Sequence, residues 1–167
     1  MCRLYAFRSN HPTRLKCSLM LSQNALMSQS WTDGRGETNL DGWGISRYEE
    51  DIPRLQKNHM PAYRDELFTR TVEQIYSRTV IAHIRQAPVG NFSIENAHPF
   101  IFDRWSFAHN GTLRGFGNLE PKLMRELDED LRQQRRGQTD SELMFLWLLT
   151  RMRRIDGVGE SPQPRFT

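Results

Sequence analysis

Cysteine is scarce in this sequence, and long hydrophobic runs are absent. Cys2 and Cys17 are the two cysteines among 167 residues, so the chain is not one of the small secreted domains that several disulfides hold together. No apolar run approaches the roughly 20 residues of a membrane-spanning helix, and no signal-peptide pattern opens the chain. We therefore expect two free thiols, a cytoplasmic protein and no membrane partner.

Neither sign of charge is in large excess: the chain has 23 Lys and Arg residues and 20 Asp and Glu residues, which gives a net charge of +3. The late arginines at residues 132–136 alternate with acids that begin at residue 126. Such alternation indicates a solvated helix face, whereas a nucleic-acid site needs a basic stripe interleaved with aromatic residues. We expect no nucleic-acid partner. No group of His, Cys, Asp or Glu has metal-ligand spacing, so we predict no metal and no other cofactor.

The length fits a single domain with a sizeable core, and 37% of the residues are hydrophobic. Apolar periodicity and turn residues predict a mixture of strands and helices. Strands are expected at residues 2–7, 43–48, 54–57, 78–86, 99–103 and 105–109, and helices at residues 16–28, 65–76, 121–136 and 140–154. We expect one domain over residues 1–155 and a flexible tail over residues 156–167.

Two of these helices carry specific boundary signals. Pro121 suits the first turn of the helix at 121–136, and Gly137 suits its end. Thr139-Asp-Ser-Glu142 has the capping-box pattern that opens a helix. The helix that follows is apolar nearly all round, which predicts burial on more than one side.

The most informative stretch runs from Val80 to Leu113. A β-branched run ends by presenting Arg85, and a second strand-like run stops at Asn110-Gly111. A guanidinium at one strand end and an amide at another indicate a site for a small anionic ligand. These residues do not by themselves specify a reaction.

Six short motifs carry a resemblance to a known family. They are Met1-Cys2, Asp41-Gly-Trp-Gly44, His83-Ile-Arg85, Asn96-Ala-His-Pro-Phe100, Ala108-His-Asn-Gly111 and Thr139-Asp-Ser-Glu142. Any one alone is a weak signal, but six in family order are a strong one. Together they resemble the class II glutamine amidotransferases of the N-terminal nucleophile hydrolase superfamily, and within it the small stand-alone amidotransferase-like proteins.

The resemblance assigns the reacting groups. Cys2 corresponds to the nucleophile, which becomes the first residue when Met1 is removed. Its own α-amino group would act through water as the general base, since the ordinary pKa of such a group is about 7.7–8.0. Asn110 and Gly111 correspond to the oxyanion hole. From the residues alone, Cys2 could instead be a buried structural cysteine, and Asn110-Gly111 a hairpin turn.

The resemblance also assigns substrate contacts. Arg85 corresponds to the residue that binds the α-carboxylate of glutamine, and Asp140 to the partner of its α-ammonium group. Trp43 is expected to form an aromatic wall near the pocket, and His98 to lie at the substrate-binding site. The residues alone leave other interpretations open. Arg85 could pair with a surface acid, Asp140 could favour a helix start through the dipole, Trp43 could follow an ordinary glycine turn, and His98 could be a core histidine.

The implied fold is α+β, an α-β-β-α sandwich of two antiparallel sheets with helices outside. Family members continue well past this length, so we expect the sandwich to be incomplete on its C-terminal side, with a further copy or a partner chain covering it. The implied activity is that of an amidohydrolase that cleaves a γ-glutamyl amide, either glutamine or a γ-glutamyl compound. The alternative is a binding or regulatory module that kept the pocket and lost turnover.

Overall fold

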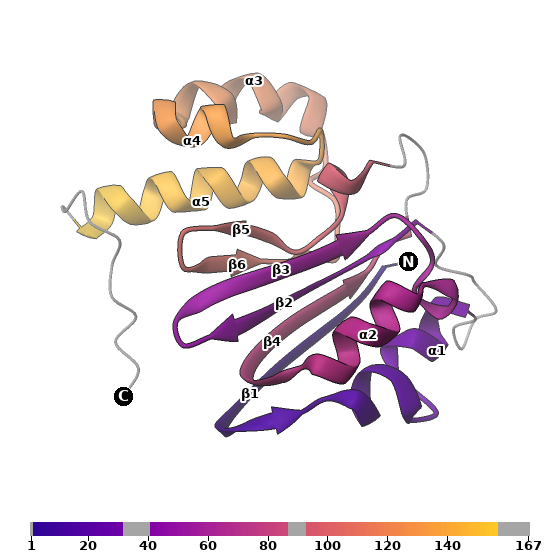
Figure 1. The fold of residues 1–167 in the computed structure, drawn as a ribbon. Coiled ribbons are helices and arrows are strands. Elements are labelled where there is room, and N and C mark those ends of the chain that lie inside the picture. The colour runs from indigo at the N-terminus through magenta and orange to yellow at the C-terminus, as the bar shows by residue number, and fades with distance from the viewer. Residues whose placement is uncertain (1, 32–40, 87–92, 157–167) are drawn as a thin grey trace. The chain divides into compact units, whose positions relative to one another are not determined.

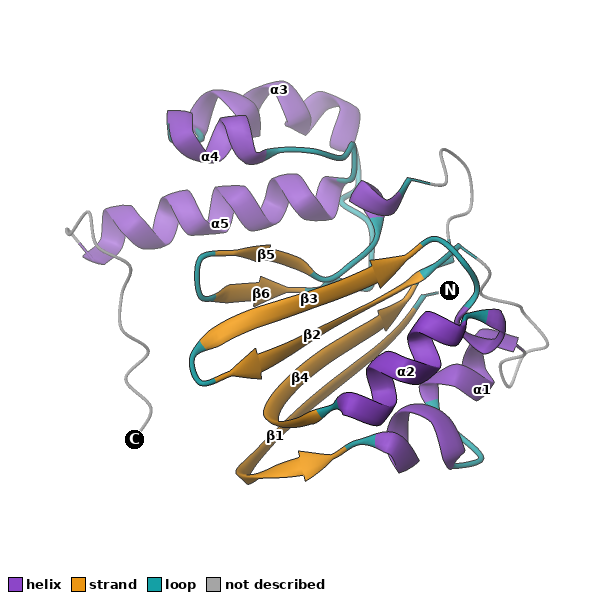
Figure 2. Cartoon of the chain, viewed as in Figure 1, coloured by secondary structure: helices purple, strands orange, loops and turns teal. Residues whose placement is uncertain are grey.

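The structure, a computed structural model, describes residues 2–31, 41–86 and 93–156. Its backbone contacts divide the chain into two compact units, Met1–Asn110 and Gly111–Thr167. Strands and the first two α-helices belong to the first unit, and three further α-helices belong to the second (Figure 2). None of the described helices is long and apolar enough to cross a membrane.

The first unit is built on a four-stranded antiparallel sheet (Figure 1). Its strands are β1 (Arg3–Arg14), β2 (Trp43–Glu49), β3 (Ile52–Asn58) and β4 (Tyr76–Ile84), in the order β1-β4-β2-β3. β2 and β3 form a hairpin whose turn includes Glu50, at a φ of 57°. β1 runs seven residues beyond the predicted strand, with a register shift between Arg8 and Thr13 that lets it continue along β4.

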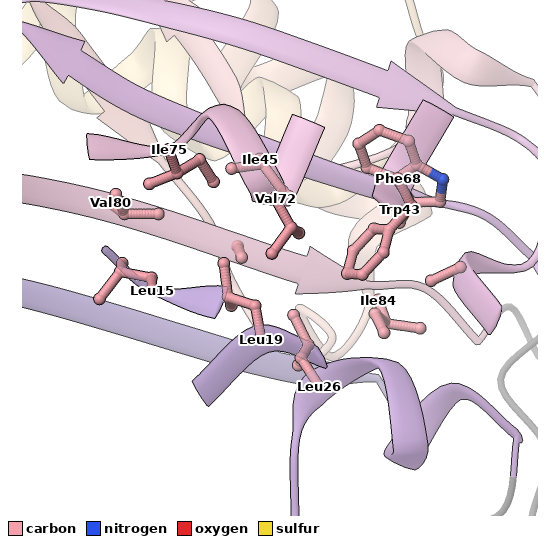
Figure 3. Packing of buried hydrophobic residues seen from close by; sticks show 12 residues of the cluster. Leu15, Leu19, Leu26, Trp43, Ile45, Phe68, Val72, Ile75, Val80 and Ile84 are labelled. Atoms are coloured by element: carbon pink, nitrogen blue, oxygen red, sulfur yellow. The ribbon is translucent and has the colours of Figure 1, made fainter. Parts of the chain in front are cut away.

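One face of this sheet carries the hydrophobic core, under α1 (Leu26–Trp31) and α2 (Glu66–Gln74). Period-two alternation sends Trp43, Ile45, Val80, Ala82 and Ile84 to this face, where they meet Leu15, Leu19, Leu26, Phe68, Val72 and Ile75 (Figure 3). Burying one such large side chain stabilises the fold by roughly 1.5–3 kcal/mol. The side chain of Asp65 caps α2 by accepting the Leu67 N–H at 2.9 Å.

The single helix predicted at residues 16–28 is wrong. The chain instead forms a short π-helical turn, Cys17–Leu21, and then α1. The polar residues Ser22, Gln23 and Asn24 separate the two, and the Ser22 N–H closes the first turn on the Cys17 carbonyl at 2.9 Å. This break lets both Leu19 and Leu26 reach the core. Both cysteines are free, with Cys17 exposed.

A second antiparallel pair consists of β5 (Phe100–Phe102) and β6 (Trp105–Phe107), and His98, just before β5, lies beside His83 of β4. The Tyr48 hydroxyl donates to the Arg104 carbonyl at 3.0 Å, which joins β2 to the β5–β6 turn. Nearer the site, the His98 carbonyl lies against Gly44, where any Cβ would collide with it. Short 3-10 turns at Ala62–Arg64 and Ile94–Asn96 precede α2 and β5. The predicted mixture of helices with antiparallel sheets is confirmed.

The second unit contains α3 (Phe116–Glu126), α4 (Glu129–Gln134) and α5 (Asp140–Asp156), with α3 and α4 packed on α5. The prediction of one helix at 121–136 is wrong. α3 begins five residues earlier, places Pro121 in its interior, and ends before Leu127. The chain breaks there because Leu127 is buried and the Asp128 N–H donates to the Thr150 hydroxyl at 3.3 Å.

The capping signal at Thr139 is confirmed, with one change. The Thr139 hydroxyl accepts the Glu142 N–H at 3.2 Å, as a capping residue does. The Glu142 carboxylate, however, turns to the preceding loop, where it accepts the N–H groups of Arg136 and Gly137 at 2.9 and 2.8 Å. α5 is buried on more than one side, as predicted, and Leu148 lies on its exposed side.

Acidic and basic side chains pair across the helices of the second unit, as the alternating charges predict. Glu126 accepts the Trp147 indole N–H at 2.7 Å and pairs with Arg151. The indole hydrogen bond lowers the pKa of Glu126, and Arg151 and Arg154 lower it further, against the opposing effect of burial. Arg153 donates to both carboxylate oxygens of Asp130 at 3.0 Å.

Candidate active site

The site lies where β1 begins and β4 ends. The antiparallel register pairs Arg3 with Ile84, so its continuation by one residue sets Cys2 opposite Arg85. The strand pairing therefore brings the first residues of the chain to the arginine of the His83-Ile-Arg85 motif. This juxtaposition depends on the register alone, because a slip of one residue would turn every side chain to the other face.

The Cys2 thiol is held by the residue that follows Arg85. The Gln86 backbone N–H points at Sγ from 3.3 Å, and Sγ lies 3.5 Å from the Gln86 carbonyl oxygen. These two contacts orient the sulfur of Cys2, a half-buried residue. Cys2 is therefore not one of the buried residues of the core, and its role as the nucleophile stays a prediction.

Two side chains hold the Cys2 carbonyl oxygen. Asn110 donates to it through Nδ2 at 3.0 Å, across 108 residues of sequence, and Arg3 donates through Nη1 at 3.1 Å. The structure thus places Cys2 and Asn110 together. Asn110 is exposed, and its amide contacts the backbone of the same residue that carries the thiol. A tetrahedral oxyanion formed at that sulfur would need such a donor.

Asn110 and Gly111 do not form a hairpin turn. β6 ends at Phe107, and the next element along the chain is the helix α3. The motif therefore follows a strand without connecting it to another strand. Gly111 directly follows Asn110 in sequence and begins the second unit, and its N–H as a second oxyanion donor stays a prediction.

Arg85 is buried, with 9% of its surface exposed. Its backbone N–H donates to the Gly42 carbonyl at 2.9 Å, and its own carbonyl accepts the Asp41 N–H at 3.3 Å. Among the described residues, no group accepts a hydrogen bond from its buried Nη1. The alternative of pairing with a surface acid is therefore wrong within the described chain. A buried guanidinium nitrogen without an acceptor favours an anion beside it.

The glycine turn before β2 has a specific role in placing Arg85. Gly42 has a φ of 100°, a left-handed conformation that side chains rarely adopt, and a Cβ there would collide with the Asn58 carbonyl. This conformation lets residues 41 and 42 bond the Arg85 backbone on both sides. The interpretation of a glycine turn at this motif is correct.

Trp43 lies wholly in the core, with no exposed surface. Its indole N–H donates to Asp65 at 2.7 Å, and its ring meets Phe68 edge-on at 5.1 Å between centroids. Asn58 donates to the same Asp65 oxygen at 2.7 Å. The described structure thus gives Trp43 the position of a packing residue, and a contact with substrate stays a prediction.

His98 lies beside another buried histidine, His83. Their ring centroids are 4.5 Å apart, and His98 also contacts Phe100 at 4.7 Å. Burial, and then the neighbouring His98 and Arg85, hold the pKa of His83 well below its ordinary value. The interpretation of His98 as a buried histidine is correct, and its contact with substrate stays a prediction.

Asp140 lies in the first turn of α5, where the helix dipole favours a carboxylate. Its Oδ2 accepts the Leu113 N–H at 2.6 Å, and its Oδ1 accepts the Ser141 hydroxyl at 3.1 Å. Both contacts belong to the second unit. The interpretation of Asp140 as a helix-start residue is therefore correct, and a role toward a substrate ammonium group stays a prediction.

Two residues that contact Cys2 were missed from the sequence: Arg3 and Gln86. Each adjoins a motif residue, which is the one signal that could have found them. Gln86 acts through its backbone, which sequence patterns do not reveal. Among the residues that the structure describes, no three His, Cys, Asp or Glu side chains are grouped to hold a metal ion.

Known proteins are similar to this chain over most of its length. The chain is 34% identical over 157 residues to the Escherichia coli amidotransferase homologue YafJ, covering 91% of this chain and 55% of that protein. It is 32% identical over 79 residues to a gamma-glutamyl-hercynylcysteine sulfoxide hydrolase of Mycobacterium tuberculosis, covering 47% of this chain and 34% of that protein. The chain spans about half the length of the first curated relatives that it matches.

Among solved structures, a glutamine aminotransferase class-II domain protein of Silicibacter pomeroyi matches with a TM-score of 0.57 and 28% identity, over 71% of this chain and 51% of that one. The family model of class-II glutamine amidotransferases matches residues 1–165. That match includes Cys2, Arg85 and Asn110, and the chain therefore belongs to the class-II glutamine amidotransferases.

Proposed function

We propose that this chain is an amidohydrolase that cleaves a γ-glutamyl amide, glutamine or a γ-glutamyl compound, with Cys2 as the nucleophile once Met1 is removed. One observation carries the proposal: a buried guanidinium nitrogen without an acceptor among the described residues lies in the residue opposite Cys2. The backbone carbonyl of Cys2 itself accepts the Asn110 amide at 3.0 Å. Family membership and the similarity to a γ-glutamyl hydrolase support the same reaction.

The reaction would run in two steps. The α-amino group of Cys2 takes the thiol proton through a water molecule, and Sγ attacks the γ-carbonyl carbon of the substrate. Asn110 turns an N–H to the oxyanion, with the Gly111 N–H as its partner. When the carbon–nitrogen bond breaks, the ammonium group returns a proton to the leaving amine. A water molecule then cleaves the thioester, releasing the γ-carboxylate product and restoring the thiol.

Substrate orientation follows from the same residues. Arg85 binds the α-carboxylate, since a planar guanidinium can donate two parallel bonds to it. Asp140 takes the α-ammonium group, and Trp43 and His98 border the pocket. These contacts would leave the γ-carbonyl toward Cys2. The proposal includes the α-β-β-α sandwich of the superfamily, with a further copy of the chain or a partner chain covering its incomplete side.

The test begins with the mature N-terminus. Mass spectrometry of the purified protein should show loss of Met1, and a glutamine-analogue diazoketone should label Cys2. Ammonia release from glutamine, or glutamate release from a γ-glutamyl compound, should disappear in Cys2→Ala and persist in Cys17→Ser, a matched loss of the other thiol. Retention of Met1, or labelling at Cys17, would overturn the assignment.

The alternative of a silent binding module predicts a different result. Mature wild-type protein would then bind glutamine in a calorimeter and release no ammonia or glutamate from any γ-glutamyl compound. Binding that depends on Arg85 but not on Cys2 would complete that pattern. The two proposals therefore separate in one set of purified proteins.

A further inference from the structure

Arg3 is the unexpected neighbour of the nucleophile. It begins β1, where its pairing with Ile84 fixes its backbone. Its Nη1 donates to the Cys2 carbonyl oxygen at 3.1 Å, the same oxygen that accepts the Asn110 amide at 3.0 Å. Arg3 has no role in the reaction proposed above, because Arg85 binds the substrate carboxylate there.

Because Arg3 and Asn110 share the Cys2 carbonyl oxygen, Arg3 affects how easily the Asn110 amide can leave that oxygen. An amide that turns toward an oxyanion gives up the acceptor it held before, and a polar group left without a partner costs free energy. With Arg3 still bonded to the Cys2 carbonyl, that oxygen keeps a charged donor when Asn110 turns away. Arg3 therefore lowers the free-energy cost of turning the Asn110 amide toward the oxyanion, and it keeps the Cys2 backbone in place.

The charge of Arg3 bears on the α-amino group. Within one residue the amino nitrogen and the carbonyl oxygen are separated by about 3 Å, so the guanidinium lies within about 6 Å of the amine. A cation at that range disfavours the protonated amine. Within the described part of the chain, the segments that meet at Cys2 also carry the charged or titratable side chains of Asp41, Arg85 and His109. Arg85 acts in the same direction, and Asp41 opposes it.

We propose that Arg3 is a positioning residue for the nucleophile, whose guanidinium holds the Cys2 carbonyl and keeps the adjacent α-amino group in its free-base form at neutral pH. This inference rests on the proposed function, because it concerns the amine that acts as general base. It adds a residue to the site and gives it two separable effects, one geometric and one electrostatic.

The variants that test it are Arg3→Gln, Arg3→Lys and Arg8→Gln. Gln removes the charge, and Lys retains it. Arg8 is an exposed arginine further along the same strand, so Arg8→Gln changes the net charge equally at a distance from Cys2. All three are compared as mature proteins, with loss of Met1 checked by mass spectrometry.

The first readout is direct and needs no turnover. In protein labelled with ¹³C-cysteine, the Cα resonance of Cys2 titrates with its amine, and Cys17 supplies an internal reference. Arg3→Gln should raise the amine pKa by about half to one unit, while Arg3→Lys and Arg8→Gln leave it close to wild type. An unmoved titration in Arg3→Gln overturns the electrostatic role.

The second readout is the pH profile of kcat/KM. Its acid limb should move upward with the amine, so Arg3→Gln should lose about 3- to 10-fold below the amine pKa and recover at high pH. A merely structural role would lower activity equally at all pH values and overturn the inference. If wild-type protein hydrolyses nothing while the titration still shifts, the proposed function fails and the electrostatic effect of Arg3 stands.

Discussion

Arg85 and Asn110 differ in when each would contact the substrate. In the proposed reaction, Arg85 would bind the substrate carboxylate in the ground state, through a buried Nη1 that has no acceptor among the described residues. The Asn110 amide donates to the Cys2 carbonyl and would turn toward an oxygen that becomes charged only during reaction. Only an interaction that strengthens in the transition state raises kcat. The two residues should therefore affect different kinetic constants.

Arg85→Ala should raise KM far more than it lowers kcat, because it removes a contact that ground state and transition state share. Asn110→Ala should lower kcat by about 10²–10³ and leave KM nearly unchanged. Both variants are measured at matched folded concentration on the γ-glutamyl substrate that wild type hydrolyses. Small and equal effects on both constants would place the site elsewhere.

His83 should make stability depend on pH. Its folded-state pKa is depressed by burial and by cationic neighbours, with His98 and Arg85 foremost and His109 and Lys57 also contributing. On acidification His83 therefore takes up a proton more readily in the unfolded chain than in the folded one. The contribution of neutral His83 to the free energy of unfolding is complete above its unfolded pKa of about 6.5 and is lost as pH falls toward its folded pKa.

Urea unfolding should accordingly give a free energy that falls by up to about 1.4 kcal/mol for each pH unit below about 6.5, on account of this residue. His83→Gln should remove that part of the slope, whereas His59→Gln, at an exposed position, should keep it. Equal slopes in wild type and His83→Gln would show that His83 does not titrate as its surroundings indicate.

At the scale of elements, strands were easier to predict than helices. Period-two alternation places Val80, Ala82 and Ile84 on one face, and burial there follows directly. The breaks at Ser22 and Leu127 go with the burial of Leu19, Leu26 and Leu127, which local periodicity does not predict. At the second break, the Asp128 N–H bonds Thr150, 22 residues away. Tertiary packing thus overrides the periodicity that suggested one continuous helix in each place.

The close approach of the His98 loop to β2 gives an element-scale prediction. Gly44→Ala should destabilise the first unit by about 1–3 kcal/mol or more, because the new Cβ meets the His98 backbone rather than a movable side chain. Ser46→Ala is the matched control, on the same strand and the same face. The Ser46 hydroxyl is buried and has no partner among the described residues, so its removal should be neutral or stabilising.

Urea unfolding followed by tryptophan fluorescence reports both changes, since Trp43 lies beside Gly44. A loss of stability in Gly44→Ala no larger than in Ser46→Ala would mean that the His98 backbone moves away from the new Cβ at little cost in free energy. In that case the segment at residues 96–100 is not fixed by its contact with β2.

At the scale of the whole molecule, the sequence motifs located more of the site than periodicity did. Cys2 and Asn110 meet as the family resemblance implies, although 108 residues separate them. Arg3 and Gln86 escaped notice because they act through a shared carbonyl and a backbone amide. Asp140 stands apart from both cases: it lies in the second compact unit, where its carboxylate accepts hydrogen bonds from Leu113 and Ser141.

Asp140→Asn therefore tests whether the second unit contributes to substrate binding. If the carboxylate takes the α-ammonium group, the variant should raise KM about 10-fold or more for a substrate with a free amine, since a charge-assisted bond is lost. It should change KM little for the same substrate acetylated at that amine. Asp130→Asn, an exposed acid of the same unit paired with Arg153, is the control and should change neither. Equal KM shifts for the free and acetylated substrates would confine Asp140 to its role at the start of α5, where it accepts the Leu113 N–H.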